Sequence, residues 1–224
     1  MIKKVFVLDK GFVELISHTP EADLLIINAA RASFDKEHEE FDKASDEKLI
    51  NYLAKHRHVL PFRHPHITLR IYAPIFVLRQ LGKHQVGFSW SEVSRRYIDG
   101  AIDFYTPQQF RKRPEKGIKQ GSGEVFHEEN NQDILDLYET SCRESVAKYN
   151  NMLSQGVAPE MARMVLPQSM YTTTVTTGSL LGWNHMFKQR TDSHTQLETR
   201  EYAEAIGAII KFIAPYGWDA LCVH

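Results

Sequence analysis

Cationic and amide side chains recur at helical spacing around residue 80, and this is the first pattern that suggests binding chemistry. Arg79 and Lys83 are four residues apart, as are Gln80 and His84. A helix would place these pairs on two adjacent stripes. Further hydroxyl and guanidinium groups, suited to bidentate phosphate contact, follow along the chain at Ser94, Arg95, Arg96, Arg163 and Arg190. Together they suggest a polyanion pocket, with the alternative that the arginines are simply solvated.

Four histidines, at positions 56, 58, 64 and 66, raise the question of a metal site. Histidine is the commonest metal ligand in proteins. However, His64 and His66 alternate across Pro65 at the entry to a predicted strand, and their spacing matches no strong zinc pattern. No cysteine or carboxylate cluster stands beside them. We therefore predict no metal site.

The sequence offers no convincing protein nucleophile. Ser91 or Ser94 could pair with His84 as nucleophile and base, but no GxSxG elbow is present. Neither GxGxxG nor GxxxxGK[ST] occurs, so no Rossmann or P-loop site is indicated. Cys142 and Cys222 lie far apart without a CxxC motif, which argues against a disulfide framework and a thiolate zinc site.

Two charged segments allow more than one interpretation. The run RKRPEKGIK at residues 111–119 is basic but has no interleaved aromatic residues for base stacking, which favours a solvated loop. Asp192, Ser193 and His194, with Glu198, could support acid–base chemistry. Equally, Asp192 and Ser193 could cap the last helix while Glu198 faces solvent.

Hydrophobic periodicity, together with runs of β-branched and aromatic residues, predicts the elements that would position these residues. Strands are predicted at residues 2–8, 66–73 and 169–177, with a turn at Gly11. Helices are predicted at residues 21–33, from a Ser45 cap to residues 56–58, and at 74–82, 131–155, 159–166, 179–188 and 194–212. The charged segment 35–46 is expected to be exposed. Residues 83–100 show no single period, and there the candidate functional side chains are densest.

Composition indicates an ordinary soluble chain. Of 224 residues, 42% are hydrophobic and 25% are charged, close to the globular average. The formal net charge of −1 gives no global attraction to nucleic acid or anionic lipid, so any anion site must be local. There is no secretory signal pattern, and no apolar run approaches the roughly 20 residues that cross a bilayer. We expect one mixed domain spanning residues 1–224, in the cytoplasm, with neither nucleic-acid nor membrane partners.

Eight segments, in order, resemble the flavin-dependent thymidylate synthases. They are LDKGFVEL at residues 8–15, AARASF at 29–34, APIFVLRQ at 73–80, EVSRRY at 92–97, FYTP at 104–107, ARMVLP at 162–167, TGSLLGW at 177–183 and RTDSHTQLE at 190–198. The resemblance runs from the first strand to the last helix, and so covers nearly the whole chain.

The resemblance implies a fold and an activity. The fold would be α/β (α+β), with a central antiparallel sheet flanked by helices, assembled as a homotetramer whose active sites combine several subunits. The activity would convert dUMP to dTMP, with methylenetetrahydrofolate as one-carbon donor and FAD, reduced by NADPH, as hydride donor. No protein nucleophile would attack the base. Alternatives are a related methylase or hydroxymethylase of another pyrimidine nucleotide, or a non-catalytic nucleotide-binding homologue.

The resemblance also assigns site residues. Catalytic roles fall to Arg190, which would face the uracil, and to Ser94 and Glu92. Positions matching dUMP contacts are Gln80, Glu92, Ser94, Arg95, Arg96, Arg163 and Arg190. Positions matching FAD contacts are Ser33, His58, Lys83, His84, Gln85, Ser179 and His185.

The family's motif is altered in this chain. The family has Arg-His-Arg, seven residues, then Ser, whereas this sequence has Lys83, His84 and Gln85, eight residues, then Ser94. Lys83 keeps a charge without the planar fork of arginine, and Gln85 has no charge. Leu181 also stands where the family often has an arginine. We therefore expect flavin phosphate contacts that are weaker or come from elsewhere.

Overall fold

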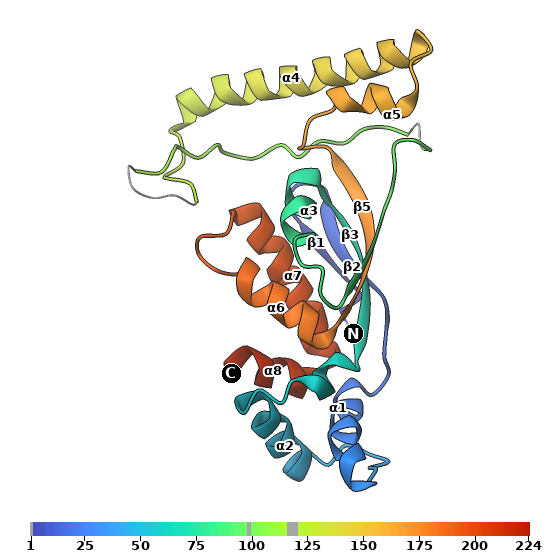
Figure 1. The fold of residues 1–224 in the computed structure, drawn as a ribbon. Coiled ribbons are helices and arrows are strands. Elements are labelled where there is room, and N and C mark those ends of the chain that lie inside the picture. The colour runs from blue at the N-terminus through green and yellow to red at the C-terminus, as the bar shows by residue number, and fades with distance from the viewer. Residues whose placement is uncertain (1, 98–99, 116–120) are drawn as a thin grey trace.

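A five-stranded antiparallel sheet forms the centre of the protein. The computed structural model describes residues 2–97, 100–115 and 121–224. The strand order is β1-β2-β3-β5-β4 (Figure 1), and every neighbouring pair is antiparallel. The strands are Lys4–Val7 (β1), Gly11–His18 (β2), His66–Pro74 (β3), Phe88–Glu92 (β4) and Tyr171–Ser179 (β5). The predicted central antiparallel sheet is confirmed.

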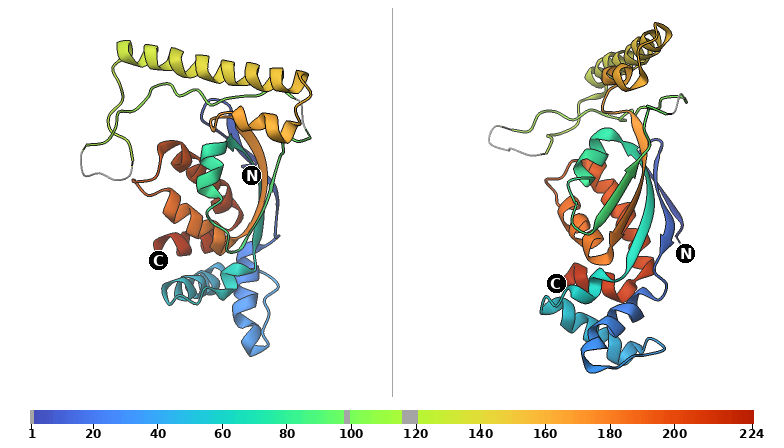
Figure 2. Two further views of the ribbon diagram at one scale, coloured as in Figure 1. Left: turned by 45° about the horizontal axis from the view of Figure 1, so that its top comes forward. Right: turned by 45° about the vertical axis from the view of Figure 1, so that its right-hand side comes forward.

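Helices cover one face of the sheet and extend beyond both of its ends. They span Ala22–Arg31 (α1), Lys43–Lys55 (α2), Ile75–Leu81 (α3), Glu128–Ser154 (α4), Pro159–Ala162 (α5), Leu180–Arg190 (α6), Leu197–Ile213 (α7) and Pro215–Val223 (α8). α3, α6 and α7 lie against the sheet; α1, α2 and α8 gather at one end, and α4 with α5 at the other (Figures 1 and 2). Within the described residues, no helix combines the length and apolarity needed to span a membrane.

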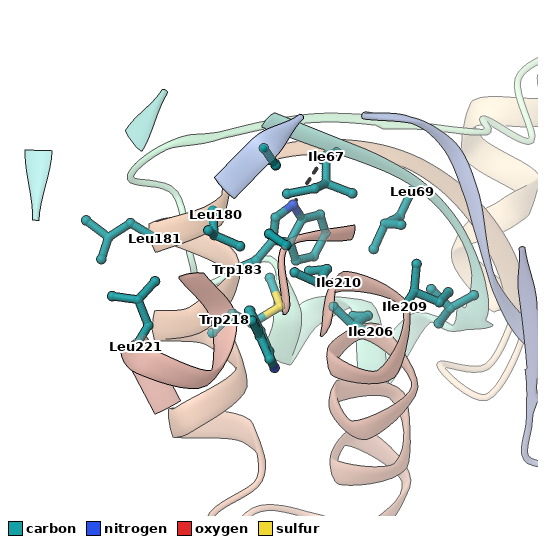
Figure 3. Close-up of a cluster of buried hydrophobic side chains, with 14 of the residues drawn as sticks. Ile67, Leu69, Leu180, Leu181, Trp183, Ile206, Ile209, Ile210, Trp218 and Leu221 are labelled. Atoms are coloured by element: carbon teal, nitrogen blue, oxygen red, sulfur yellow. Dashed lines mark hydrogen bonds between the residues drawn. The ribbon is translucent and has the colours of Figure 1, made fainter. Parts of the chain in front are cut away.

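The core fixes α6 and α7 on the sheet. Alternation along β3 buries Ile67, Leu69 and Ile71 completely, as the period of two predicts. Trp183 of α6 is fully buried, and its Nε1 donates to the Ile67 carbonyl at 3.1 Å (Figure 3). α7 adds its own apolar face at Ile206, Ile209 and Ile210. Because both helices are packed in the core, the two ends of the α6–α7 connection are held in place.

Two strands were absent from the sequence prediction. Gly11 begins β2, paired with Val7, and the turn lies before it, where Leu8 has a φ of 59°. A Cβ at Gly11 would lie 1.7 Å from the Tyr202 hydroxyl oxygen of α7, so the position needs glycine. β4 lies at the sheet edge, and only Phe88 and Trp90 are partly buried in it. Phe88 and Trp90 alternate with the exposed Ser89 and Ser91, a period of two that the sequence analysis did not recognise within residues 83–100.

The start of α2 differs from the prediction. Asp42, not Ser45, is the N-cap, and its carboxylate accepts from the backbone amides of Ala44 at 3.2 Å and Ser45 at 3.3 Å. The charged segment 35–46 is mostly exposed, as expected. The exception is Asp46, which is fully buried and pairs with Arg31 at 2.9 Å.

The chain ends in a helix that the sequence analysis did not include. α8 begins at Pro215, a residue favoured in the first turn of a helix. Asp23 of α1 accepts from the backbone amides of Gly217 at 2.7 Å and Tyr216 at 3.2 Å. Burial raises the pKa of Asp23 to about 6. The N-terminus of α8 is thus capped by a residue distant in sequence, which no local pattern could reveal.

Candidate active site

A cavity of about 1080 Å³ lies where the end of α3, the α6–α7 connection and a segment near residue 111 meet. Gln80 comes from α3, Arg111 and residues 121–123 from the segment, and the other lining residues lie between 188 and 200. The charged lining includes four cations and one acid, namely Arg111, Lys188, Arg190, Arg200 and Asp192. A cavity of this size and charge suits an anionic ligand as large as a nucleotide.

Arg190, the last residue of α6, is held against His84. Its Nε donates to His84 Nε2 at 3.2 Å, and because an arginine nitrogen only donates, His84 must be neutral with its proton on Nδ1. Burial, then the charges of Arg190 and His185, lower the pKa of His84. Among the described residues, no carboxylate pairs with Arg190. Its guanidinium is therefore oriented but not neutralised.

A side-chain bond joins α3 to the residue before α7. Gln80 Nε2 donates to Gln196 Oε1 at 2.7 Å. The connection itself is held by Arg200, whose Nη2 donates to the carbonyls of Ser193 at 3.4 Å and Thr195 at 3.3 Å. The α6–α7 connection, which forms one wall of the cavity, is therefore bonded both to α3 through Gln80 and to α7 through Arg200.

Asp192 organises the α6–α7 connection and does not cap α7. Its Oδ1 accepts from the His194 backbone amide and contacts the His194 ring Nδ1, each at 2.8 Å. These bonds lower the pKa of Asp192. α7 begins at Leu197 with Gln196 as N-cap and no side-chain capping bond, so the predicted cap by Asp192 and Ser193 is wrong. Residues 194–196, which the sequence analysis assigned to the helix, lie instead in the connection that follows Asp192.

Glu198 is buried, so the alternative that it faces solvent is also wrong. It is 3% exposed, and its two oxygens accept from Arg111 Nη2 at 2.9 and 2.8 Å. Tyr105 donates its hydroxyl to Glu198 at 3.3 Å. Arg111, the first cation of the basic run, is therefore ion-paired and not solvated. Residues 116–119 of that run lie outside the described residues.

The nucleotide candidates after β4 bond mainly to their own segment. Ser94 Oγ accepts from the backbone amide and Nε of Arg96, at 3.3 and 3.2 Å. Arg95 donates to the carbonyls of Gly100 and Ala101, the latter at 2.8 Å. Glu92 ends β4 and is exposed. None of these four residues lines the cavity.

Arg163 lies at another end of the molecule. It begins a short 3₁₀ turn, residues 163–165, directly after α5, and is exposed. Of the seven predicted dUMP residues, the structure therefore brings only Gln80 and Arg190 together in the cavity of one chain. The other five lie on separate, exposed segments.

The flavin candidates divide into two groups. Lys83, His84 and Gln85 follow α3, and His185 is exposed on α6. The others belong elsewhere. Ser33 is exposed just after α1 and His58 is exposed just after α2. The buried Ser179 accepts from the Gly182 amide at 3.1 Å as the N-cap of α6.

The first group fits an anionic cofactor. Burial, then the charges of Lys188 and Arg63, lower the pKa of His185, which shows that cations gather around this part of α6. Among the described residues, neither Lys83 nor Lys188 pairs with a carboxylate. Cations without a carboxylate partner, beside the half-buried His84 and the exposed His185, are suitable donors for the phosphates of FAD.

Sequence reasoning missed the residues that frame the cavity. Gln196, Arg111 and Arg200 were not among the candidates, and Glu198 was considered only for acid–base chemistry or a solvent-facing role. The one usable signal was a carboxylate in the first turn of a helix, a position that the helix dipole favours. That signal does not reveal that Glu198 is buried or that its partner is Arg111.

Comparisons with known proteins agree with the resemblance seen in the sequence. Residues 14–216 match the family model described as thymidylate synthase complementing protein. The flavin-dependent thymidylate synthase of Thermosipho africanus is 40% identical over 217 residues, covering 96% of this chain and 92% of that protein. The protein of the same name from Thermus thermophilus is 37% identical over 218 residues, covering 97% and 78% respectively.

Solved structures share the fold. The UMP/dUMP methylase PolB from Streptomyces cacaoi, bound with 5-Br dUMP, has a TM-score of 0.85 at 28% identity and covers 98% of this chain and 97% of its own. Its structure with 5-Br UMP gives 0.84 at 27% identity, with 98% and 96% covered. Family model, relatives and fold agree: the chain belongs to the flavin-dependent thymidylate synthase family of enzymes.

Proposed function

We propose that this enzyme converts dUMP to dTMP, with methylenetetrahydrofolate as one-carbon donor, FAD as bound cofactor and NADPH as reductant. When bound, reduced FAD supplies the hydride that completes the methyl group. The proposal rests on the family and on a cavity with an oriented, unneutralised arginine. It includes a single domain over residues 1–224 and a cytoplasmic location, as expected from the sequence.

The observation that carries the proposal is the environment of Arg190. A guanidinium held by a neutral imidazole, with no carboxylate partner among the described residues, keeps its full charge for a ligand. Placed beside the uracil, Arg190 would stabilise negative charge that develops as the pyrimidine carbon becomes nucleophilic. Because the guanidinium is already oriented, little reorganisation is needed during the reaction.

Gln80 and Gln196 would position the nucleotide. Their mutual bond at 2.7 Å leaves one further N–H on Gln80 and the whole amino group of Gln196 as donors. Both residues line the cavity with Arg190. We assign them contacts with the nucleotide, close to the base that Arg190 faces.

The remaining dUMP residues would come from other subunits of a homotetramer. Glu92, Ser94, Arg96 and Arg163 lie outside the cavity of their own chain, and Arg96 and Arg163 are exposed. Guanidinium groups of this kind clamp a phosphate when a second protomer brings them to it. Arg95, which bonds to two carbonyls of its own segment, would shape that segment for phosphate binding.

The chain supplies no thiolate at the cavity. Cys142 is buried and contacts Ser169 at 3.8 Å, and burial raises the pKa of the half-buried Cys222. Neither lines the cavity. This supports a reaction in which no cysteine attacks the base.

The test is product analysis with the FAD-loaded, full-length protein. We expect dTMP from dUMP when methylenetetrahydrofolate and NADPH are both present, and none when either is omitted. UMP and dCMP, assayed in parallel, decide between this activity and methylation or hydroxymethylation of another pyrimidine nucleotide. Binding of dUMP by a protein that retains no flavin would instead identify a non-catalytic homologue.

A further inference from the structure

Residues 110–113 pair with residues 122–126 in a two-stranded ribbon that reaches the cavity. The Lys112 amide donates to the Glu124 carbonyl at 2.7 Å, and the Phe126 amide donates to the Phe110 carbonyl at 3.0 Å. Arg111 and Val125 form an antiparallel bridge between the two sides. We call residues 110–113 and 122–126 the ribbon. Its members Arg111, Ser122 and Gly123 line the cavity together with Gln80 and Arg190.

One guanidinium attaches the ribbon to α7. Arg111 donates through Nη2 to both oxygens of Glu198, at 2.9 and 2.8 Å, and through Nε to Ser122 Oγ at 2.7 Å. It therefore contacts both sides of the ribbon and the first turn of α7. Among the described residues, no other ion pair joins the ribbon to the rest of the protein.

Glu198 is built to be charged where it lies. Its side chain is 4% exposed, its position in the first turn of α7 lets the helix dipole favour a carboxylate, and Arg111 and Tyr105 satisfy its oxygens. Removing one partner of such a pair leaves an uncompensated charge in the interior. The ribbon would then lose its attachment, and Arg111 would become a free cation in the cavity.

From this geometry we propose that Glu198 is a positioning residue, which acts through Arg111 to hold the ribbon as a fixed wall of the nucleotide cavity. The inference rests on the proposed function, because it concerns how the same cavity holds dUMP. Glu198 also neutralises Arg111, so that Arg190 remains the strongest anion site. It touches neither substrate nor cofactor.

The test compares the full-length, FAD-loaded enzyme with three variants. Glu198→Gln removes the charge and keeps the shape, and Arg111→Met with Glu198→Gln removes both charges. Glu204→Gln, an exposed carboxylate on the same helix, is the matched control. The measurements are kcat, KM and Kd for dUMP, and hydrogen exchange of peptides covering residues 108–115 and 121–127 without ligand.

For Glu198→Gln we expect faster exchange in the ribbon and a KM for dUMP raised about 10- to 100-fold, because misplaced binding groups lose most of their effect. The value of kcat should change much less, and Glu204→Gln should match the wild type. The double variant should recover stability, since no unpaired buried charge remains, yet keep the fast exchange and the high KM. If Glu198→Gln does not fold, the double variant carries the test.

Two results would overturn the inference. One is an unchanged KM in a variant whose ribbon exchanges faster; the other is a KM restored by the double variant while the ribbon still exchanges fast. Failure of the wild-type enzyme to bind dUMP would overturn the proposed function and remove this inference with it. That failure is distinguishable, because the exchange comparison is made without nucleotide.

Discussion

The α6–α7 cavity and the segment after β4 carry the same kinds of side chain in opposite situations. In the cavity, Gln80 bonds to a partner 116 residues away, Arg190 to one 106 away and Arg111 to one 87 away. After β4, Ser94 and Arg95 bond to partners two to six residues away. The cavity is therefore held by bonds between distant parts of the fold, whereas the side chains of Ser94 and Arg95 bond within their own segment. That segment is attached to β5 through its backbone, where the Val93 amide donates to the Thr173 carbonyl at 2.9 Å.

This difference separates residues that one chain brings together in the cavity from residues that reach the nucleotide only in the proposed homotetramer. Long-range bonds fix Arg190 and Gln80 before any ligand arrives, which is the arrangement expected for groups that act on the reacting base. In the proposed homotetramer, exposed cations such as Arg96 and Arg163 would meet a phosphate bound by another protomer. Substitutions inside the cavity and outside it should therefore have different effects on kcat, on KM and on recovery by subunit exchange.

The largest effect should follow Arg190→Ala. We expect kcat for dTMP formation to fall about 10²- to 10³-fold, as for loss of one oriented donor at a developing negative charge. The fold should survive, since Arg190 ends its helix and is only half-buried. Steady-state kinetics and a melting curve measure the two effects separately.

The control for that variant is Lys188→Ala, which removes a cation of the same cavity that is exposed. Its loss of activity should be much smaller. Wild-type turnover by Arg190→Ala would remove the role assigned to this residue.

The next effect should follow Arg163→Ala, with a KM for dUMP raised roughly 10- to 100-fold by loss of a charged hydrogen bond to phosphate. The sharper experiment mixes this variant with Arg190→Ala and allows subunits to exchange. If each site takes these two arginines from different protomers, about a quarter of the sites in the mixed oligomers regain both. At dUMP concentrations below the wild-type KM, activity should then rise above that of either variant alone.

Gln80→Ala mixed with Arg190→Ala is the matched control for subunit exchange. Both residues line the cavity of one chain, so no mixed site contains both wild-type residues and no recovery is expected. Recovery in this mixture, or none in the first, would show that the two regions are not divided between protomers as proposed.

A smaller, pH-dependent effect should follow His84→Gln. The pKa of His84 is lowered below its usual 6.5, first by burial and then by Arg190 and His185. His84 is therefore neutral at neutral pH, and protonation at lower pH removes the acceptor for Arg190 and adds a like charge beside it. Activity should fall as the pH drops through that lowered pKa, by about tenfold per unit.

Glutamine keeps an acceptor at this position and does not titrate, so the variant should lose that acid limb of kcat/KM. His185→Gln is the control, since the pKa of His185 is also lowered but no bond to Arg190 is found for it. An acid limb that stays in His84→Gln and disappears in His185→Gln would assign the titration to His185.

The same contrast explains how far the sequence predicts the structure. β3 and α4 follow from their own periodicity, because alternation or a 3.6-residue repeat reflects burial on one face. β5 follows from its density of β-branched residues, which favour strands. The cap of α2 shows the limit: Asp42 and Ser45 are both good capping residues, and spacing alone does not choose between them. α8 depends on Asp23, nearly two hundred residues earlier in the chain.

For the site, Arg190 and Gln80 come from the resemblance to a family, while their partners come only from the structure. The pair of Arg111 and Glu198 joins a basic run to a helix start, and each looks solvated when read locally. Burial of an ion pair depends on contacts between distant segments, which neither composition nor local spacing records.

The smallest effect concerns the altered motif after α3. Lys83→Arg together with Gln85→Arg should lower the Kd for FAD by about tenfold, since arginine offers a planar fork to phosphate and lysine does not. Gln85 already donates to the Gly82 carbonyl at the end of α3, and an arginine there would keep a donor near the negative end of the helix. The control pair is Lys148→Arg on α4 with Gln155→Arg at the C-cap of that helix. Both positions are exposed, and the pair makes the same change in charge elsewhere. An affinity that stays constant or falls in the motif variant would mean that the end of α3 does not hold the flavin phosphates. Lys188 and Arg63, whose charges act on His185, would then be the donors to test next. Like Lys83, neither has a carboxylate partner among the described residues.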